Sequence, residues 1–184
     1  MRRSGFVLVG GSSSRMGRDK GLLPFRGERL VDRIARQVLT AAGSVTLVGA
    51  PERYTGLGYR AIPDRIPDCG PLGGVHTALS ETRAEWNLIV ACDMPRLDGG
   101  FLDALLGRAE QETCECLVPV SSPGKIEPLC AAWHRTALAE VEAALRDGVR
   151  RMSDVLNLLK TKHWPANPAW FANANTPQEW ATHA

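Results

Sequence analysis

The chain has 184 residues, 44% of them hydrophobic, which is enough for one well-buried core and too little for two, so we predict a single domain over residues 1–184. Its 22 lysines and arginines against 20 acidic residues give a net charge of +2, without a basic run that would suit nucleic acid or a membrane surface. The first apolar run, residues 6–9, is too short for a signal peptide or a membrane span, so we predict a cytoplasmic protein.

Apolar runs and helical periodicities alternate through the first half of the chain. Strands are predicted at residues 6–9, 45–48 and 86–91, and helices at 28–42 and 75–83, with Gly43 as the C-terminal cap of the first helix. Such alternation favours a mostly parallel sheet with helices on both faces, which binds ligands at the carboxyl ends of its strands.

The second half continues the pattern with one reversal. A helix is predicted at 99–111, strands at 116–120 and 128–133, helices at 135–146 and 151–159, a loop at 165–168 and a last short helix from Thr176. The turn at 121–125 makes the strand that follows it antiparallel. The predicted fold class is therefore α/β: three layers, doubly wound and Rossmann-like, around a mixed, mostly parallel sheet.

The cysteines and histidines do not suggest a metal centre. Five cysteines, at positions 69, 92, 114, 116 and 130, form no CxxC pair, and the four histidines have no ligand spacing. We predict reduced, mostly buried thiols and no zinc site.

The segment LVGGSSSRMGRDK, residues 8–20, is the strongest functional feature. It is neither a GxxxxGK[ST] loop nor a GxGxxG loop. Its glycines let backbone N–H groups approach a phosphate chain, and Arg15 and Lys20 add the positive charge that a triphosphate requires. The alternative is a solvated loop with incidental cations.

The same segment resembles the molybdenum cofactor guanylyltransferases, whose pattern LxGGxSxRMGxDK it matches at every fixed position. Sugar-nucleotide and cytidylyl relatives usually carry AAG where this chain has Val9, Gly10 and Gly11, so the paired glycine favours the guanylyl branch. The resemblance implies a nucleotidyltransferase fold of the nucleotide-diphospho-sugar transferase type. The nucleotide-binding residues that it implies here are Leu8, Val9, Gly10, Gly11 and Lys20.

Two further segments resemble that family. Asp64 precedes Gly-Pro-Leu-Gly-Gly at residues 70–74, which resembles the GPLxG element near the nucleotide and includes Gly74; taken alone, this pentapeptide is a turn. Cys-Asp-Met-Pro at residues 92–95 resembles the CDxP motif, which makes Asp93 the expected Mg²⁺ ligand. The alternative role for Asp93 is a cap for the next helix or turn.

The C-terminal part resembles the family's acceptor-binding part. Arg150 and Arg151 follow a glycine and suit a phosphate monoester, and Asn173 and Asn175 stand in a segment similar to FxNxNTPEE. Ordinary helix-end and capping roles are the alternatives. Glu127 departs from the His or Gln common in relatives, and its role, strand start or acceptor contact, stays open.

The resemblance as a whole implies transfer of GMP from GTP to the terminal phosphate of molybdenum cofactor (molybdopterin), with release of pyrophosphate. Arg15, Lys20 and Asp93 would be the catalytic residues, with Mg²⁺ as cofactor and proteins of cofactor biosynthesis and delivery as further partners. Two alternatives remain: a cytidylyltransferase for the same or another phosphate acceptor, and a non-catalytic GTP-binding or cofactor-carrying protein.

Overall fold

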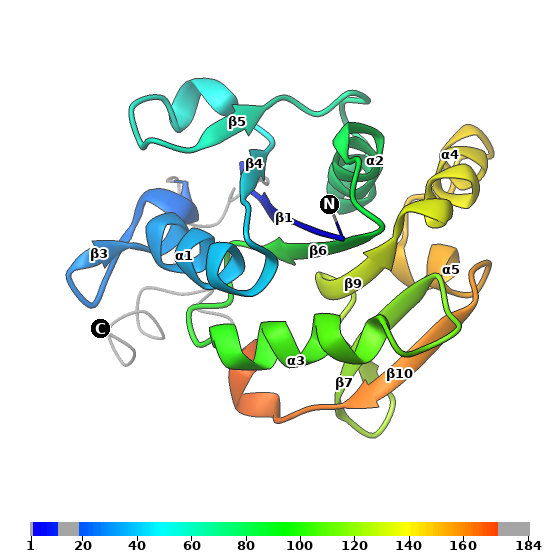
Figure 1. The fold of residues 1–184 in the computed structure, drawn as a ribbon. Coiled ribbons are helices and arrows are strands. Elements are labelled where there is room, and N and C mark those ends of the chain that lie inside the picture. The colour runs from blue at the N-terminus through cyan, green and yellow to red at the C-terminus, as the bar shows by residue number, and fades with distance from the viewer. Residues whose placement is uncertain (1, 11–18, 173–184) are drawn as a thin grey trace.

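The computed structural model describes residues 2–10 and 19–172, and its centre is a twisted sheet with helices on both faces (Figure 1). The sheet strands are β1 (Arg3–Leu8), β4 (Thr46–Val48), β5 (Arg60–Ile62), β6 (Trp86–Ala91), β7 (Cys116–Ser122), β8 (Lys125–Ile126), β9 (Cys130–His134) and β10 (Thr161–Pro165). The helices are α1 (Leu30–Ala42), α2 (Gly70–Glu81), α3 (Gly99–Ala109), α4 (Leu138–Arg146) and α5 (Met152–Leu156). The short 3-10 helices are η1 (Lys20–Leu22), η2 (Pro51–Arg53), η3 (Arg135–Ala137) and η4 (Pro168–Phe171), and β2 (Pro24–Phe25) pairs with β3 (Glu28–Arg29) in a separate hairpin.

The main sheet has the strand order β10-β7-β9-β6-β1-β4-β5, with β8 paired to β7. The strands from β5 to β6 are parallel, and β9 runs antiparallel to both of its neighbours. The prediction of a mixed, mostly parallel sheet with an antiparallel strand near residue 130 is confirmed. From β1 the chain passes outward to β4 and β5 and then crosses to β6 on the other side of β1, so a topological switch point lies between β1 and β6.

Alternate residues of the central strands build two cores, one on each face of the sheet. On β1, Val7 faces the core shared with α1 and α3, whereas Phe6 faces the core shared with α2, α4 and α5. On β6, Leu88 and Ile89 divide in the same way. Because residues 5–7 of β1 and 86–90 of β6 are buried on both faces of the sheet, the sequence shows nearly continuous apolar runs there. The predicted three-layer architecture is confirmed (Figure 1).

The boundaries of α1 and α2 differ from the prediction in instructive ways. Gly43 ends α1 as predicted, with φ of 74° and its N–H bonded to the carbonyl of Leu39. The helix begins two residues late, because residues 28–29 belong to the small hairpin. The helix predicted from residue 75 already begins at Gly70. The Gly-Pro-Leu-Gly-Gly segment is therefore not a turn but the start of α2, since proline is compatible with the first helical turn.

Apart from the two-residue strands β2, β3 and β8, two strands were not predicted, β5 and β10, and both lie at edges of the sheet. An edge strand faces solvent and needs no continuous apolar run. β10 shows this best: Lys162 and His163 are exposed although the strand pairs with β7 over its whole length. The remaining boundary differences are shifts at element ends. The largest is three residues: β1 begins at Arg3 instead of residue 6, α4 begins at Leu138 instead of residue 135, and α5 stops at Leu156 instead of residue 159.

The five cysteines are all free and buried, as predicted. Within the part of the chain that the structure describes, no helix combines the length and the apolar character needed to cross a membrane.

Gly5 on β1 allows α1 to pack closely on the sheet. A Cβ at this position would lie 2.3 Å from Val38 Cγ1 and 2.6 Å from the carbonyl oxygen of Ser44. We expect Gly5→Ala to lower the free energy of unfolding by about 2–3 kcal/mol, because the added methyl group would have to displace the buried Val38 side chain of α1 and the backbone after the helix. Urea denaturation would measure the change. The matched control is Gly107→Ala on α3, where the nearest atom is 3.7 Å away and alanine favours the helix; an equal loss in both variants would contradict the packing argument.

Candidate functional site

A cavity of about 520 Å³ opens at the carboxyl ends of β1, β4 and β6. Its walls come from β1 and the residues after it, from η1, from the start of α2 and from the end of β6. The lining residues are Leu8, Val9, Gly10, Asp19, Lys20, Val48, Asp64, Asp68, Gly70, Pro71, Gly74, Ala91, Cys92, Asp93 and Leu129. The cavity therefore lies at the topological switch point, where a doubly wound sheet is expected to bind its ligand.

The end of β1 forms the floor of the cavity and is held from both sides. Val9 donates its N–H to the carbonyl of Val48 at 2.8 Å, and Cys92 donates its N–H to the carbonyl of Leu8 at 3.1 Å. Gly10 then turns the chain with φ of +78°, a value that side chains with a Cβ rarely adopt. The predicted residues Leu8, Val9 and Gly10 thus line the cavity.

The start of α2 forms the opposite wall. Gly70 and Pro71 line the cavity, so the amino end of a 12-residue helix, with its partial positive charge, borders the space. A Cβ on Gly74 would lie 2.9 Å from Leu8 Cδ2, so the glycine allows α2 to lie directly against β1. The structure thus brings Gly74 to the cavity, as the sequence predicted.

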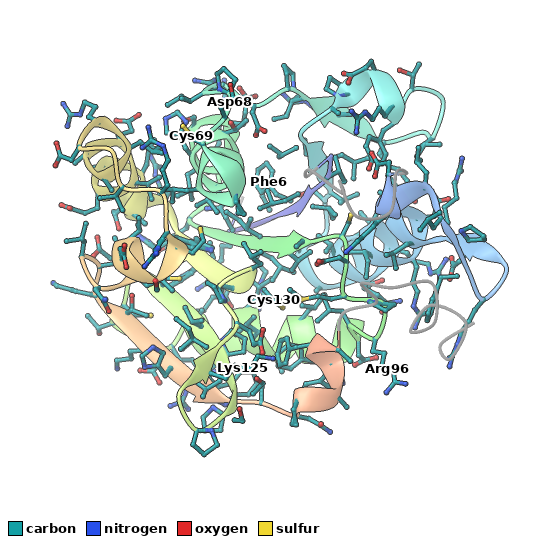
Figure 2. All side chains as sticks on the ribbon, turned by 180° about the vertical axis from the view of Figure 1, so that it is seen from behind. Phe6, Asp68, Cys69, Arg96, Lys125 and Cys130 are labelled. Atoms are coloured by element: carbon teal, nitrogen blue, oxygen red, sulfur yellow. The ribbon has the colours of Figure 1, made fainter. Side chains whose placement is uncertain are left out.

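Two carboxylates precede α2 on the same side of the cavity. Asp64 was predicted and Asp68 was not, and burial raises the pKa of Asp64. Asp68 has a φ of 59°, in the left-handed region that is uncommon for residues other than glycine. Figure 2 shows Asp68 and its neighbour Cys69 at the beginning of α2. Hydrogen-bond acceptors therefore lie beside the helix N-terminus.

Asp93 and Lys20 come from distant parts of the sequence and lie near each other at the cavity. Both line it, Lys20 at the start of η1 and Asp93 just after β6. Burial raises the pKa of Asp93, and the nearby ammonium of Lys20 acts in the opposite direction. The cavity thus holds a cation and a carboxylate side by side, an arrangement that can bind a metal-bound triphosphate.

The Asp93 carboxylate has a coordination position that protein groups leave open. Its Oδ1 atom is buried and accepts no hydrogen bond within the described residues. In the same part of the chain no group of three or more His, Cys, Asp or Glu residues could enclose a metal ion. A single carboxylate is unsuited to an all-protein metal cage but fits Mg²⁺, which usually binds one or two carboxylates together with substrate phosphates and water.

Two of the predicted acceptor-binding residues, Arg150 and Arg151, do not line this cavity. The guanidinium of Arg150 donates to the carbonyls of Leu145 and Val149, at 3.0 and 2.9 Å, and Arg151 is exposed at the start of α5. Four other predicted site residues, Gly11, Arg15, Asn173 and Asn175, lie outside the described residues.

Glu127 has a structural environment that the sequence did not suggest. Only 8% of the residue is exposed, and its Oε1 accepts from the Ser121 hydroxyl at 2.6 Å and lies 3.0 Å from the Lys125 ammonium. The three side chains join β7, β8 and the turn before β9; Figure 2 labels Lys125 on this hairpin. Glu127 itself does not line the cavity, but Leu129, two residues later, does.

Sequence reasoning missed several residues of the cavity wall. Apolar surface at the cavity comes from residues near strand ends, namely Val48, Cys92 and Leu129. Their position next to the ends of predicted strands is the signal that could have identified them. Asp19 belongs to the loop pattern but was not predicted to be a site residue. Gly49, which follows β4 and does not line the cavity, was not predicted either: a Cβ there would lie 2.0 Å from the carbonyl oxygen of Val9, so glycine is required beside the end of β1.

Comparison with known proteins bears on the family and the fold of the chain. Residues 5–163 match the family model of the MobA-like NTP transferase domain. A Flavobacterium johnsoniae protein named "Probable molybdenum cofactor guanylyltransferase" is 34% identical over 151 residues, which cover 82% of this chain and 78% of the relative. A Bacillus cereus protein of the same name is 29% identical over 188 residues, covering 96% of this chain and 93% of the relative.

Solved structures share the fold. The crystal structure of molybdopterin-guanine dinucleotide biosynthesis protein A from Archaeoglobus fulgidus matches with a TM-score of 0.83 at 24% identity, covering 98% of this chain and 96% of that one. The 2-C-methyl-D-erythritol 4-phosphate cytidylyltransferase from Thermus thermophilus matches with a TM-score of 0.76 at 15% identity, covering 100% and 97%. The predicted nucleotidyltransferase fold is therefore confirmed.

Proposed function

Because the chain belongs to the MobA-like NTP transferase family, we propose that it transfers GMP from GTP to the terminal phosphate of molybdenum cofactor. The products are the molybdopterin guanine dinucleotide form of the cofactor and pyrophosphate. The family and its relatives make the chain a nucleotidyltransferase of molybdenum cofactor biosynthesis. The observation that carries the finer proposal is the meeting of Lys20, Asp93 and the glycine-opened end of β1 in one cavity.

The nucleotide occupies the cavity with its base toward β1 and α2 and its phosphates toward η1. Leu8, Val9 and Gly74 offer an apolar and closely approachable surface for a planar base. Asp64 provides an acceptor for base or ribose donors. Gly10, together with Gly11 of the loop, is the feature that favours guanine over cytosine.

The reaction is an in-line displacement at the α-phosphorus. An oxygen of the acceptor phosphate forms a bond to the α-phosphorus, while the bond from the α-phosphorus to the oxygen bridging to the β-phosphate breaks, and pyrophosphate leaves with that electron pair. The attacking phosphate is already anionic near neutral pH, so no general base is required. Catalysis then consists of positioning and of offsetting the charge on the leaving group, which Lys20 and Arg15 do.

Asp93 would hold Mg²⁺ through the oxygen that accepts no hydrogen bond. When bound, the ion neutralises phosphate charge and orients the triphosphate. Lys20, which already acts on the pKa of Asp93, would lie beside the same phosphates.

In this proposal the acceptor binds to residues of the C-terminal part of the chain. Arg150 and Arg151, together with Asn173 and Asn175, hold its terminal phosphate in this proposal. Arg150 would exchange its bonds to the carbonyls of Leu145 and Val149 for bonds to the phosphate. Proteins of cofactor biosynthesis that deliver molybdopterin are the expected partners.

Pyrophosphate release with each of the four nucleoside triphosphates, with and without molybdopterin, tests the proposal. We expect release with GTP and Mg²⁺ that depends on molybdopterin and is at least about tenfold slower with CTP, since a base-reading site discriminates by at least 1.4 kcal/mol. Faster release with CTP would identify a cytidylyltransferase. Binding of GTP without release would identify a non-catalytic carrier.

A further inference from the structure

We propose that Tyr54 is a positioning residue for nucleotidyl transfer. Its buried hydroxyl binds the Asp19 carboxylate and thereby fixes the backbone on both sides of Lys20. Tyr54 lies at the end of η2, does not line the cavity and is absent from the loop pattern. The inference rests on the proposed role of Lys20 toward the triphosphate.

Three donors converge on the Asp19 carboxylate. Oδ1 accepts from the Tyr54 hydroxyl at 2.7 Å and from the Gly21 N–H at 3.1 Å, and Oδ2 lies 3.4 Å from the Arg53 guanidinium. The Asp19 side chain is only 10% exposed. Two donors come from η2 and its end, and one from η1, so this carboxylate joins the two short helices.

The Tyr54 hydroxyl is committed to this bond. Tyr54 is 1% exposed and belongs to the core beneath α1 and α3. Burial and the hydrogen bond to Asp19 both raise the pKa of Tyr54, so the phenol stays protonated and donates. A hydroxyl this deeply buried is costly without an acceptor, and the carboxylate supplies one.

Gly21 extends the same contact to the end of β6. A Cβ on Gly21 would lie 2.7 Å from the Tyr54 hydroxyl and 3.4 Å from Cys92 Sγ, so only glycine lets η1 pack this closely. Cys92 precedes Asp93. Lys20, between Asp19 and Gly21, is therefore placed at a fixed distance from Asp93 by packing on one side and by the Asp19–Tyr54 hydrogen bond on the other.

The consequence concerns how well Lys20 meets the phosphates. A lysine carries a point charge on a flexible stem, so its contribution depends on where the backbone places it. Loss of the Tyr54 hydroxyl would leave the Lys20 ammonium in the cavity, but the backbone that carries Lys20 would be held less firmly. The effect should therefore appear in triphosphate binding and should vanish when Lys20 is absent.

A double-mutant cycle in the full-length protein tests this inference. We expect Tyr54→Phe to weaken binding of magnesium GTP about tenfold by calorimetry, as for loss of a hydrogen bond to a charged group. In the Lys20→Ala background the same change should weaken binding less than twofold. Tyr59→Phe, at a half-buried tyrosine packed on the same core outside the cavity, is the matched control and should bind GTP like the wild type.

Each outcome decides the inference. Unchanged binding in Tyr54→Phe, or equal weakening in both backgrounds, would overturn it, because a merely structural tyrosine would not depend on Lys20. Asp19→Ala, which removes the acceptor of the Tyr54 hydroxyl, repeats the cycle if Tyr54→Phe does not fold. The same double-mutant cycle is also measured with CTP. If the wild type binds CTP but not GTP, the proposed specificity for guanine is wrong, and the cycle measured with CTP then decides the role of Tyr54. If the wild type binds neither GTP nor CTP, both the proposed function and the role of Tyr54 are wrong.

Discussion

Asp93→Asn is expected to reduce GMP transfer about 10³-fold, because the variant loses the carboxylate that would hold the metal against the phosphates. The same change should raise the Tm of the ligand-free protein by about 3 °C, since burial outweighs the attraction of Lys20 for the Asp93 carboxylate, and its removal relieves about 1 kcal/mol of desolvation penalty. A substitution that lowers activity while it raises stability is typical of a residue that serves function rather than folding. Steady-state kinetics and thermal unfolding without nucleotide measure the two effects.

Glu140→Gln is the matched control for Asp93→Asn. It makes the same carboxylate-to-amide change at an exposed position of α4, away from the cavity. Kinetics and Tm should both match the wild type. If Asp93→Asn retained turnover within tenfold of wild type, or if its Tm fell, the carboxylate would be a structural cap and not a metal position.

The parts of the fold that were predicted are those with a local signal. β6 was predicted with both ends correct, because a strand buried on both faces shows a nearly continuous apolar run, here interrupted by the buried Asn87. The position of Asp93 followed from that strand, since side chains after the carboxyl end of a central strand reach the ligand side of the sheet. Gly43 was predicted as a cap because a left-handed residue must end α1 there.

The parts that were missed depend on contacts between distant segments. β10 is polar and becomes a strand only through its pairing with β7. The start of α2 was placed too late because Gly73 and Gly74, poor helix formers, are required there by close contacts with Ile66 and Leu8. Propensity alone assigns these glycines to a turn, and tertiary packing reverses that assignment.

The candidate site divides in the same way. Family resemblance supplied Leu8, Gly74 and Asp93, and the structure places all three at one cavity. It could not supply the hydrogen bond between Asp19 and Tyr54, which are 35 residues apart and carry no pattern that links them. Positioning contacts of this kind are specified by the fold.

Lys20→Ala is expected to lower kcat about 10³-fold and to weaken magnesium GTP binding at least about tenfold, because the ammonium acts more strongly on the charge that develops on pyrophosphate than on bound GTP. Tm should stay within about 2 °C of wild type, since a lysine that lines an open cavity contributes little to the core. Lys20→Arg keeps the charge with a different shape and should lose less. Lys160→Ala, at an exposed lysine after α5, is the control and should retain full activity. Equal losses in kcat for the alanine and arginine variants would mean that shape rather than charge matters at this position, and a wild-type kcat in Lys20→Ala would remove Lys20 from the mechanism.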